Sequence, residues 1–361
     1  ESLKLLNKSL ENHLVIFKGD PLKILKELIK NNNVSGVYWN RNYAPWEIKR
    51  DTVIKQEIKK TGIECETFNG NLLWEPWEIL KKDGTPYKVF TPFYRKGCLG
   101  SSPPRAPLPK PPKINLKQDV VKNNEFDINK TNANNWQKSI LSHALIGEKK
   151  AFERLEFFIK NGLKNYKDGR NFPSLDNVSR LAPNFHFGEI SPNKVWYTVV
   201  NNKQNENTDH FLSELGWREF SNHLLYHFPQ FIYENLQKKF DGFPWKNDGI
   251  ALKKWQKGLT GFPLVDAGMR ELWQTGSMHN RLRMVVGSFL VKNLLIDWRH
   301  GAKWFWNCLF DADIANNTAG WQWIAGCGAD AAPYFRVFNP VTQSEKFDKK
   351  GIYIKKYIPE L

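Results

Sequence analysis

Cysteine is scarce in this sequence, and its distribution excludes several classes of protein. Only four cysteines occur among 361 residues. They lie far apart, with no Cys-x-x-Cys pair, at Cys65, Cys98, Cys308 and Cys327. Such spacing argues against a disulfide framework and against a zinc site, and it suits a reducing compartment. The histidines show no metal-ligand spacing either, so we expect a cytoplasmic protein without a metal centre.

Long apolar runs and net negative charge are also missing. No stretch of 18 or more apolar residues occurs, so no segment is predicted to span a membrane. Lysine and arginine number 53 against 37 acidic residues, which gives a formal net charge of +16. A basic surface attracts polyanions, and nucleic acid is the leading candidate. Heavy coding of Lys and Asn by an AT-rich genome is the alternative cause, and charge alone does not separate the two.

Alternating strands and helices are predicted in the first third of the chain. Short apolar runs indicate three strands, at 13–17, 34–39 and 63–68. Cap and stop residues indicate two helices, one from Pro21 to about Lys30 after Asp20, the other from Pro45 to about Lys60 before Gly62. This order implies a parallel sheet with helices on both faces.

A boundary between two domains is predicted near residue 113. The stretch from Ser101 to Pro112 is rich in proline and is typical of a semi-rigid connector. Residues 114–135 are polar and rich in Asn and Lys, and the pattern is helical from about Trp136 onward. We therefore expect a domain at 1–113, a linker at 114–142 and a helical domain at 143–361.

The stretch from Trp273 to Trp298 is the most informative in the chain. It is predicted as one helix whose apolar face carries Met278, Leu282, Val285, Val286 and Phe289. A second face carries Asn280, Arg283 and Met284, at helical spacing. Polar groups on so apolar a helix need partners if they are buried. A ligand rich in carbonyls and phosphates would supply them.

This stretch resembles the most recognisable motif of the DNA photolyase and cryptochrome flavoproteins. Five further segments are similar to that family and follow in its order, namely 214–220, 260–270, 311–317, 321–323 and 330–340. The likeness is nearly continuous from Tyr166 to Leu361. The sequence is thus identified as a member of that superfamily, most like the bacterial class I cyclobutane pyrimidine dimer photolyases.

The resemblance implies a fold and cofactors. The fold would be α/β plus all-α, with an N-terminal parallel, Rossmann-like α/β antenna domain, a long connector and a C-terminal helical FAD-binding domain. A first strand and the last helices of the family are missing from this sequence, so we expect both domains to be truncated. Four suitably placed cysteines are lacking, which argues against the iron–sulfur branch. Segment 88–93 resembles an antenna-domain segment, and we expect methenyltetrahydrofolate rather than deazaflavin as antenna.

The resemblance assigns ten residues to the flavin, namely Tyr166, Ser179, Arg180, Leu181, Phe211, Arg218, Arg283, Asp311, Asp313 and Asn317. Arg283 and Asp311 would form a buried ion pair against the isoalloxazine, Asp313 would accept from the flavin edge, and Asn317 matches the position facing N5. Val178 and Ala182 stand where Thr and Ser are common, so two phosphate hydrogen bonds are expected to be missing. For the loop alone, a turn or helix cap is the alternative.

The resemblance also assigns the substrate and electron-transfer residues. The lesion would be held by Glu214, Trp217, Asn280, Met284 and Trp323, with DNA phosphates on Arg281 and Arg336. Electrons would pass along Trp245, Trp298 and Trp321. Histidines 210, 223, 227 and 279 are interpreted as surface or capping groups. An ordinary packing helix is the alternative for the 214–218 set.

The function implied is light-driven repair of cyclobutane pyrimidine dimers, by electron transfer from photoexcited reduced FAD to a flipped-out dimer. The alternatives are a cryptochrome-like photoreceptor and a (6-4) photolyase. An ordinary flavin oxidoreductase has no support, because no Gly-x-Gly-x-x-Gly occurs. Asn280 and Met284 carry no titratable proton, which favours the cyclobutane lesion. We expect a monomeric bacterial protein of the cytoplasm that is associated with the nucleoid when it is bound to damaged DNA.

Overall fold

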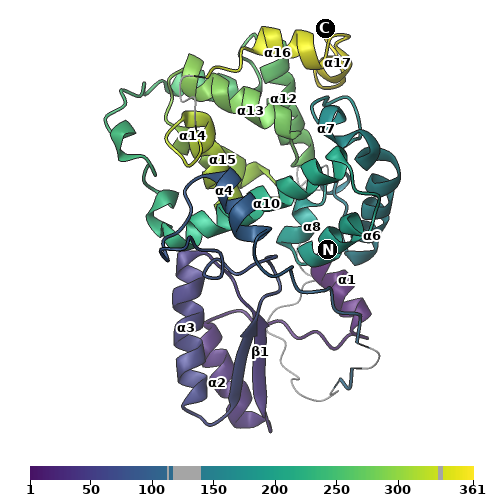
Figure 1. Ribbon diagram of the computed structural model, residues 1–361, viewed down its shortest axis with the longest axis vertical. Helices are drawn as coiled ribbons and strands as arrows, with labels where there is room; N and C mark the ends of the chain where they lie inside the picture. The colour runs from purple at the N-terminus through teal and green to yellow at the C-terminus, as the bar shows by residue number, and fades with distance from the viewer. Residues whose placement is uncertain (112–113, 117–139, 332–335) are drawn as a thin grey trace.

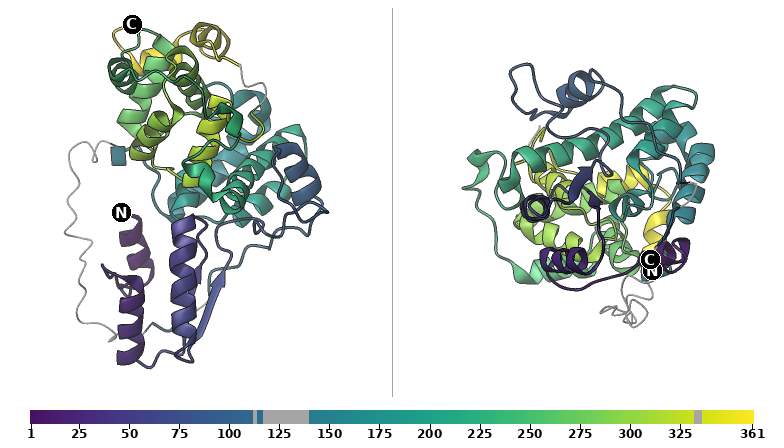
Figure 2. Two further views of the ribbon diagram at one scale, coloured as in Figure 1. Left: turned by 90° about the vertical axis from the view of Figure 1, so that its left-hand side faces the viewer. Right: turned by 90° about the horizontal axis from the view of Figure 1, so that it is seen from below.

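The computed structural model describes residues 1–111, 114–116, 140–331 and 336–361. A small N-terminal arm, which contains a two-stranded sheet, extends from a much larger helical body (Figures 1 and 2). The arm contains α1 Ser2–Ser9, α2 Pro21–Asn31, β1 Gly36–Asn40, α3 Pro45–Lys59 and β2 Glu64–Phe68. The two strands are parallel, with Val37 opposite Cys65.

The predicted helices of the arm are confirmed. The side chain of Asp20 accepts a hydrogen bond from the Lys23 amide at 2.8 Å, which caps α2 where the sequence predicted. Gly62 adopts a positive φ of 77° after α3, a conformation that favours glycine. Helix propensity, capping residues and turn residues act through neighbours along the chain, so their effects can be predicted from the sequence alone.

Two predictions for the sheet are wrong. Residues 13–17 form no strand in the part of the chain that the structure describes, where the sheet consists of β1 and β2, because an apolar run does not by itself fix whether a segment enters a sheet. Helices α2 and α3 cover one face of the sheet, not both (Figure 2). The side chains of Tyr38 and Phe68 stack at 6.4 Å on the other face and are about half exposed.

The segment after β2 joins the core of the helical body. It contains α4 Phe90–Pro92 and η1 Phe93–Cys98. Buried Glu219 accepts hydrogen bonds from the amides of Leu73 at 2.8 Å and Trp74 at 3.3 Å. Burial raises the pKa of the Glu219 carboxyl to about 7. Residues 73–98 therefore pack into the helical body, and the boundary at residue 113 stays a prediction.

The proline-rich stretch is held against the helical body. The Tyr197 hydroxyl donates to the Pro104 carbonyl at 2.5 Å, and the Asn193 amide donates to the Arg105 carbonyl at 2.7 Å. Most of the predicted linker, 114–142, lies outside the described residues.

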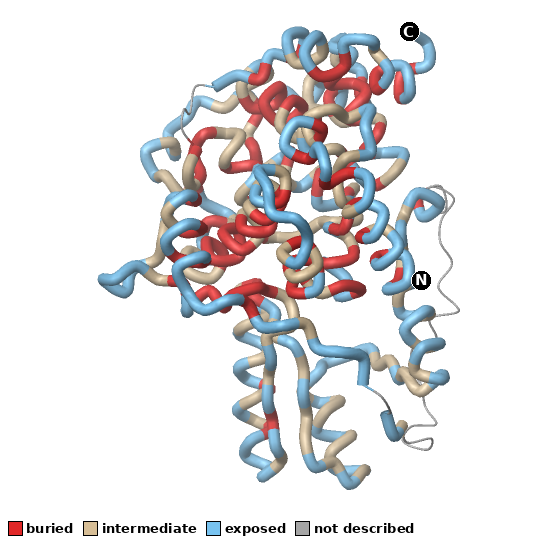
Figure 3. Tube along the Cα trace, turned by 45° about the vertical axis from the view of Figure 1, so that its right-hand side comes forward, coloured by how far each residue is buried: buried red, intermediate tan, exposed pale blue. Residues whose placement is uncertain are grey.

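The helical body consists of many short helices around one long one. Its elements are α6 Glu148–Phe157, η3 Phe158–Gly162, η4 Leu163–Asn165, α7 Tyr166–Gly169, α8 Ala182–His186, α9 Pro192–Val200, α10 Glu206–His227, η5 Pro229–Ile232, η6 Lys238–Phe240, α11 Gly249–Lys257, α12 Pro263–Thr275, α13 Asn280–Ser288, η7 Phe289–Asn293, α14 Trp298–Cys308, α15 Ile314–Ala325, α16 Pro340–Phe347 and α17 Ile352–Tyr357. Buried residues are concentrated here, and the arm is largely exposed (Figure 3). No helix among the described residues is long and apolar enough to cross a membrane.

The predicted single helix from Trp273 to Trp298 is broken twice. Gly276 adopts a left-handed φ of 65° and ends α12, and the chain leaves helical geometry again between Asn293 and Trp298, where Leu295 has a φ of 57°. Glycine adopts positive φ at no steric cost, so it ends helices. The apolar face is nevertheless buried as predicted, with Leu282, Val285 and Val286 fully inside.

Candidate active site

One large cavity, of about 1660 Å³, lies in the helical body between α10, α13 and α15. It exceeds the range of about 300–1,000 Å³ typical of small-molecule pockets. All but three of the predicted site residues line it, and the three that do not are Trp245, Trp298 and Arg336. The fold therefore gathers residues from four separate stretches of sequence around one space.

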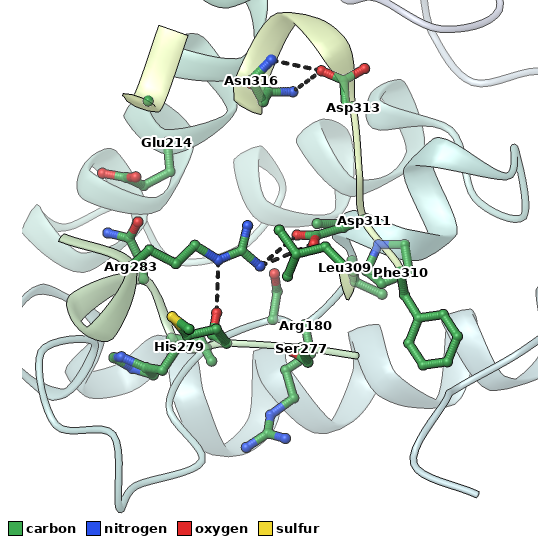
Figure 4. A pocket seen from close by; sticks show the side chains of 18 of the residues that line it. Arg180, Glu214, Ser277, His279, Arg283, Leu309, Phe310, Asp311, Asp313 and Asn316 are labelled. Atoms are coloured by element: carbon green, nitrogen blue, oxygen red, sulfur yellow. Dashed lines mark hydrogen bonds and ion pairs between the residues drawn. The ribbon is translucent and has the colours of Figure 1, made fainter. Parts of the chain in front are cut away.

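The predicted ion pair forms one wall of this cavity (Figure 4). Arg283 on α13 donates to both carboxylate oxygens of Asp311, at 2.9 and 3.0 Å, and its Nε donates to the Met278 carbonyl at 2.9 Å. The two side chains are 27% and 13% exposed, so the pair faces the cavity rather than lying wholly buried. A fixed charge pair is thus presented to whatever fills the space.

The loop before α15 presents one carboxylate and one amide. Asp313 caps α15, and one of its oxygens accepts from the backbone amide of Asn316 at 2.8 Å and from the Asn316 side chain at 2.7 Å (Figure 4). The helix-cap alternative thus holds for Asp313, which also lines the cavity. The Asn317 side-chain nitrogen donates to the Ala302 carbonyl at 2.9 Å, and Asn317 also lines the cavity.

The loop at 178–181 is shaped by an arginine that the sequence analysis missed. Arg154 on α6 donates to the carbonyls of Val178 and Ser179 and forms a two-pronged ion pair with Asp176. Its side chain is only 9% exposed. Arg180 in the same loop has a φ of 55° and also pairs with Asp176, at 3.1 Å. No sequence signal links Arg154 to a loop 25 residues later.

Glu214 on α10 has a charged partner that was also missed. Arg170 donates to the Glu214 carboxylate, and its guanidinium lies 5.3 Å from the centre of the Tyr166 ring. Arg170 and Tyr166 are four residues apart, which is the spacing of neighbours on a helix, so their contact could be predicted from the sequence. The contact with Glu214, 44 residues away, could not.

The two predicted aromatic walls are present, with one addition. Trp217 stacks on Phe90 at a centroid distance of 3.8 Å and an interplanar angle of 10°, so one face of its ring is covered by a residue from outside the α6–α17 region. Trp323 donates its indole N–H to the Asp330 carbonyl at 3.1 Å. Asn280 and Met284 lie one turn apart on α13, with the Asn280 nitrogen 3.9 Å from the Met284 sulfur.

The interpretation of the histidines is partly wrong. His279 caps α13 as expected, because its Nδ1 accepts from the Arg281 amide at 3.2 Å, but its Nε2 is buried with no hydrogen-bond partner. Burial and four nearby arginines lower its pKa to about 3. His223 is not a surface group: it is 1% exposed, and its Nε2 accepts from the Tyr87 amide at 3.1 Å.

Positive charge gathers at the edge of the cavity. Arg281 donates to the Asn171 side chain, and its guanidinium lies 4.4 Å from the centre of the Phe347 ring. Burial, together with the charges of Arg170 and Arg336, lowers its pKa. Arg336 is exposed. Arg170, although paired with Glu214, and Arg336 both repel the charge of Arg281, so an anion beside Arg281 would be stabilised and the site suits phosphate.

Two of the three predicted electron-transfer tryptophans are buried, and the third is half-buried. Trp321 lines the cavity and is 2% exposed, Trp298 is 1% exposed within the core, and Trp245 is half-buried in a second, smaller cavity. The helix α14 approaches α15 closely at Gly301, where a side chain would meet the Trp321 ring. Trp298 lies three residues before Gly301 and thus on the same helix face, which brings it toward Trp321.

The residues present fit a flavin dinucleotide. The cavity has the volume, the Arg283–Asp311 pair and the Asn317 amide have the donors and acceptors for a heteroaromatic edge, and the 178–181 loop has a positive charge for phosphate. The buried, unpartnered His279 Nε2 and Arg281 Nε are polar atoms that a ligand or water would satisfy. Among the described residues, no group of three His, Cys, Asp or Glu side chains is placed to hold a metal ion.

Comparisons with known families match both parts of the chain. A model of the FAD binding domain of DNA photolyase matches residues 211–361, and a model of DNA photolyase matches residues 1–113. The deoxyribodipyrimidine photo-lyase of Agrobacterium fabrum is 44% identical over 371 residues, covering 100% of this chain and 77% of that protein.

Solved structures agree with the sequence matches. The crystal structure of a bacterial class III photolyase from Agrobacterium tumefaciens superposes with a TM-score of 0.88 at 42% identity, covering 100% of this chain and 76% of that one. The structure of a Synechocystis cryptochrome superposes with a TM-score of 0.81 at 32% identity, covering 100% and 77%. The first of these is assigned to class III, whereas the motifs led us to expect a likeness to class I.

Proposed function

The chain belongs to the DNA photolyase and cryptochrome family, and on that premise we propose that it repairs cyclobutane pyrimidine dimers in DNA by light-driven electron transfer. The observation that carries the proposal is the shared cavity. Residues suited to a flavin and residues suited to a flipped lesion line the same space, so donor and acceptor would lie in contact. A dimer cannot reach a buried cofactor inside duplex DNA, and photolyases are among the enzymes that flip their target base out.

FAD is the cofactor that the matched domain binds, and when bound and reduced it supplies the light-driven electron. We propose that the ten residues assigned from the sequence hold it. Arg283 and Asp311 would fix charge beside the ring system, and Asn317 would present its amide oxygen to it. Ser179 and Arg180 would hold the phosphates, with Arg154 keeping that loop in shape.

The lesion would lie between Glu214, Trp217 and Trp323. The tryptophan rings offer flat apolar walls, and Phe90 backs one of them. Glu214 would accept from the pyrimidine N–H groups. Because Arg170 already binds that carboxylate, it is oriented before the lesion arrives and costs less ordering on binding.

Lesion choice follows from Asn280 and Met284. Repair of a (6-4) photoproduct moves a hydroxyl between bases and needs a proton donor, whereas opening a cyclobutane ring does not. Neither side chain titrates near neutral pH. His279 lies next to Asn280, but its Nδ1 is engaged as a helix cap and its low pKa keeps it neutral. It is therefore a poor substitute for a catalytic acid.

The test offers reduced protein each lesion in a separate oligonucleotide under blue light. We expect repair of the cyclobutane dimer and none of the (6-4) product. Repair of the (6-4) lesion would overturn the lesion assignment. Repair of neither would favour the cryptochrome alternative, which the likeness to a Synechocystis cryptochrome keeps open.

Photoreduction of the cofactor would use Trp321, Trp298 and Trp245 in that order. Trp321 lines the large cavity, Trp298 is buried in the core and Trp245 is half-buried beside the smaller cavity, which supports the order. Trp321→Phe should slow light-driven reduction of oxidised flavin and leave repair by pre-reduced protein nearly intact. An equal loss of both would place Trp321 in the substrate site instead.

Finer features complete the proposal. Residues 1–113 would form the antenna domain, 114–142 a linker and 143–361 the catalytic domain, with methenyltetrahydrofolate as antenna. The match of residues 1–113 supports the first boundary.

The protein would act as a monomer in the bacterial cytoplasm, nucleoid-associated on damaged DNA, and the four free cysteines suit that compartment. Extraction of the purified holoprotein followed by mass spectrometry identifies the antenna.

A further inference from the structure

The buried tryptophan of the proposed electron path is hydrogen-bonded to a surface carboxylate through one amide. The Trp298 indole N–H donates to the Asn235 side-chain oxygen at 3.0 Å, and the Asn235 side-chain nitrogen donates to the Asp241 carboxylate at 2.8 Å. Asn235 is 4% exposed, and the Asp241 side chain is 51% exposed. A line of two hydrogen bonds thus leads from the core to solvent.

The orientation of the Asn235 amide is determined by its partners. The indole nitrogen can only donate, so it requires the amide oxygen, and the carboxylate can only accept, so it requires the amide nitrogen. Flipping the amide would break both bonds at once. The oxygen of Asn235 therefore faces Trp298.

The loop that carries Asn235 is fixed by the helix that carries Trp321. Gln322, which is fully buried on α15, accepts from the Leu236 amide at 2.9 Å. Its side-chain nitrogen donates to the carbonyls of Phe231 at 2.6 Å and Glu234 at 2.9 Å. Asn235 thus sits between backbone groups that one side chain holds on both sides.

Charges around the two outer tryptophans nearly cancel. The Arg299 guanidinium lies 4.8 Å from the centre of the Trp298 ring, which disfavours positive charge on that ring, but Asp297 pairs with it at 2.9 Å. The small cavity beside Trp245 is lined by three acids and two bases, namely Glu234, Asp241, Asp297, Lys238 and Arg299. Three minus two leaves one net negative charge there, on a chain whose net charge is +16.

We propose that Asn235, held by Asp241, is a positioning residue that keeps positive charge mobile on Trp298. This inference rests on the proposed tryptophan path. On that path Trp321 would donate one electron to the oxidised flavin, Trp298 would reduce the oxidised Trp321, and Trp245 would reduce the oxidised Trp298. The Trp245 indole then releases its N–H proton to water. One electron has entered the cofactor, and one electron and one proton have left Trp245.

The chemistry of the amide explains why this residue suits Trp298. An indole that has lost an electron has a far more acidic N–H, so its hydrogen bond strengthens. The Asn235 oxygen accepts that bond but is too weak a base to take the proton. The Asp241 carboxylate polarises the Asn235 amide, which further strengthens the hydrogen bond between the amide oxygen and the Trp298 indole. The charge then moves on to Trp245, where solvent and carboxylates are available, instead of being trapped as a deprotonated radical.

The test compares three variants of the holoprotein. Asn235→Leu removes the acceptor, Asp241→Asn removes the charge while keeping the shape, and Asn235→Asp places a base directly on the indole. Glu234→Gln is the matched control, because that carboxylate lines the same small cavity and pairs with Lys238, as Asp241 does at 3.9 Å, whereas the Asn235 amide donates to Asp241. Trp298→Phe identifies the signals that belong to Trp298.

Two readouts apply, one of them in the dark. In proton–nitrogen NMR, Asp241→Asn should shift the Trp298 indole proton upfield, and Glu234→Gln should not. Under light, Asn235→Leu should lower the yield of flavin photoreduction about tenfold, the factor expected for a hydrogen bond to a charged group. Asn235→Asp should show a deprotonated Trp298 radical in transient absorption. Repair by pre-reduced protein should be unchanged in all three.

The outcomes separate this inference from the proposed path. The role of Asn235 is overturned, and the path left intact, if the Trp298 indole resonance does not move in Asp241→Asn. The same conclusion follows if Asn235→Leu keeps parental photoreduction while Trp298→Phe loses it. Parental photoreduction in Trp298→Phe overturns the path and this inference with it. If Asn235→Leu does not fold, the isosteric Asp241→Asn variant decides.

Discussion

At the scale of single residues, Arg283 joins three parts of the chain. It bonds the carbonyl that precedes α13, pairs with Asp311 from the loop before α15, and faces the cavity. Removing either partner would leave the other charge unpaired beside the space that the flavin would fill, where an unpaired charge is costly once water is displaced. Individual contacts of this kind, rather than surface area, would decide whether the cofactor stays bound.

Asp311→Asn and Arg283→Ala should therefore lose flavin. We expect purified variants with less than half of the parental flavin-to-protein absorbance ratio, and the melting temperature of each apoprotein reports whether the fold survives. Lys26→Ala, which breaks an ion pair of 2.7 Å in the arm, is the control and should retain its flavin. Full occupancy in both cavity variants would contradict the pocket assignment.

His279 should make the protein sensitive to acid. Its folded pKa of about 3 lies below its ordinary value of 6.5, so between those pH values the unfolded chain binds more protons than the folded one. Stability is lost as pH falls through that window, by up to about 5 kcal/mol at its lower end. His279→Asn keeps a capping acceptor and removes the titration. Its unfolding free energy, measured by urea titration, should fall less between pH 6.5 and 4 than that of the parent.

At the scale of elements, the pairing of α14 with α15 positions Trp321. Both helices are short, and nothing in their sequences predicts that they pack against each other. Contact is close because Gly301 has no side chain: a Cβ there would lie 2.1 Å from the Trp321 ring. One absent methyl group therefore decides where a residue of the proposed electron path lies.

Gly301→Ala should displace Trp321. A buried indole cannot swing away, so overpacking should cost about 1–3 kcal/mol, and photoreduction should slow along with the loss of stability. Chemical denaturation and continuous illumination measure the two effects. Gly249→Ala is the matched control, because that glycine starts α11 with nothing within 4 Å of a new Cβ. If Gly301→Ala kept the parental stability and rate of photoreduction, α14 and α15 would separate more easily than the structure indicates.

At the scale of the whole molecule, charge and cavity combine into a surface for DNA. Arg170 and Arg336 are both close enough to Arg281 to lower its pKa, and Arg170 and Arg281 line the cavity. Phosphate contacts position a duplex, and contacts inside the cavity select the lesion. The two contributions respond differently to salt.

Arg336→Ala should weaken binding to damaged and undamaged DNA alike and reduce the slope of log affinity against log salt by about 1. Trp217→Ala should mainly erase the preference for damage. Fluorescence anisotropy over a salt series measures both, with Lys60→Ala on the arm as control. The assignment fails if the preference at fixed salt survives in Trp217→Ala.

The sequence alone determined what depends on neighbours along the chain. The Asp20 cap, the stop at Gly62 and the buried face of 282–286 are local patterns that the structure confirms, and the family motifs are local patterns whose family the comparisons confirm. Tertiary structure decided what depends on distant partners. Residues 13–17 lie outside the described sheet of β1 and β2, and His223 became a buried acceptor for the Tyr87 amide. Arg170 reached Glu214, and Asn235 joined Trp298 to Asp241. Hydrogen bonds and packing across such separations carry no periodic signal, because their geometry exists only after the helices have met.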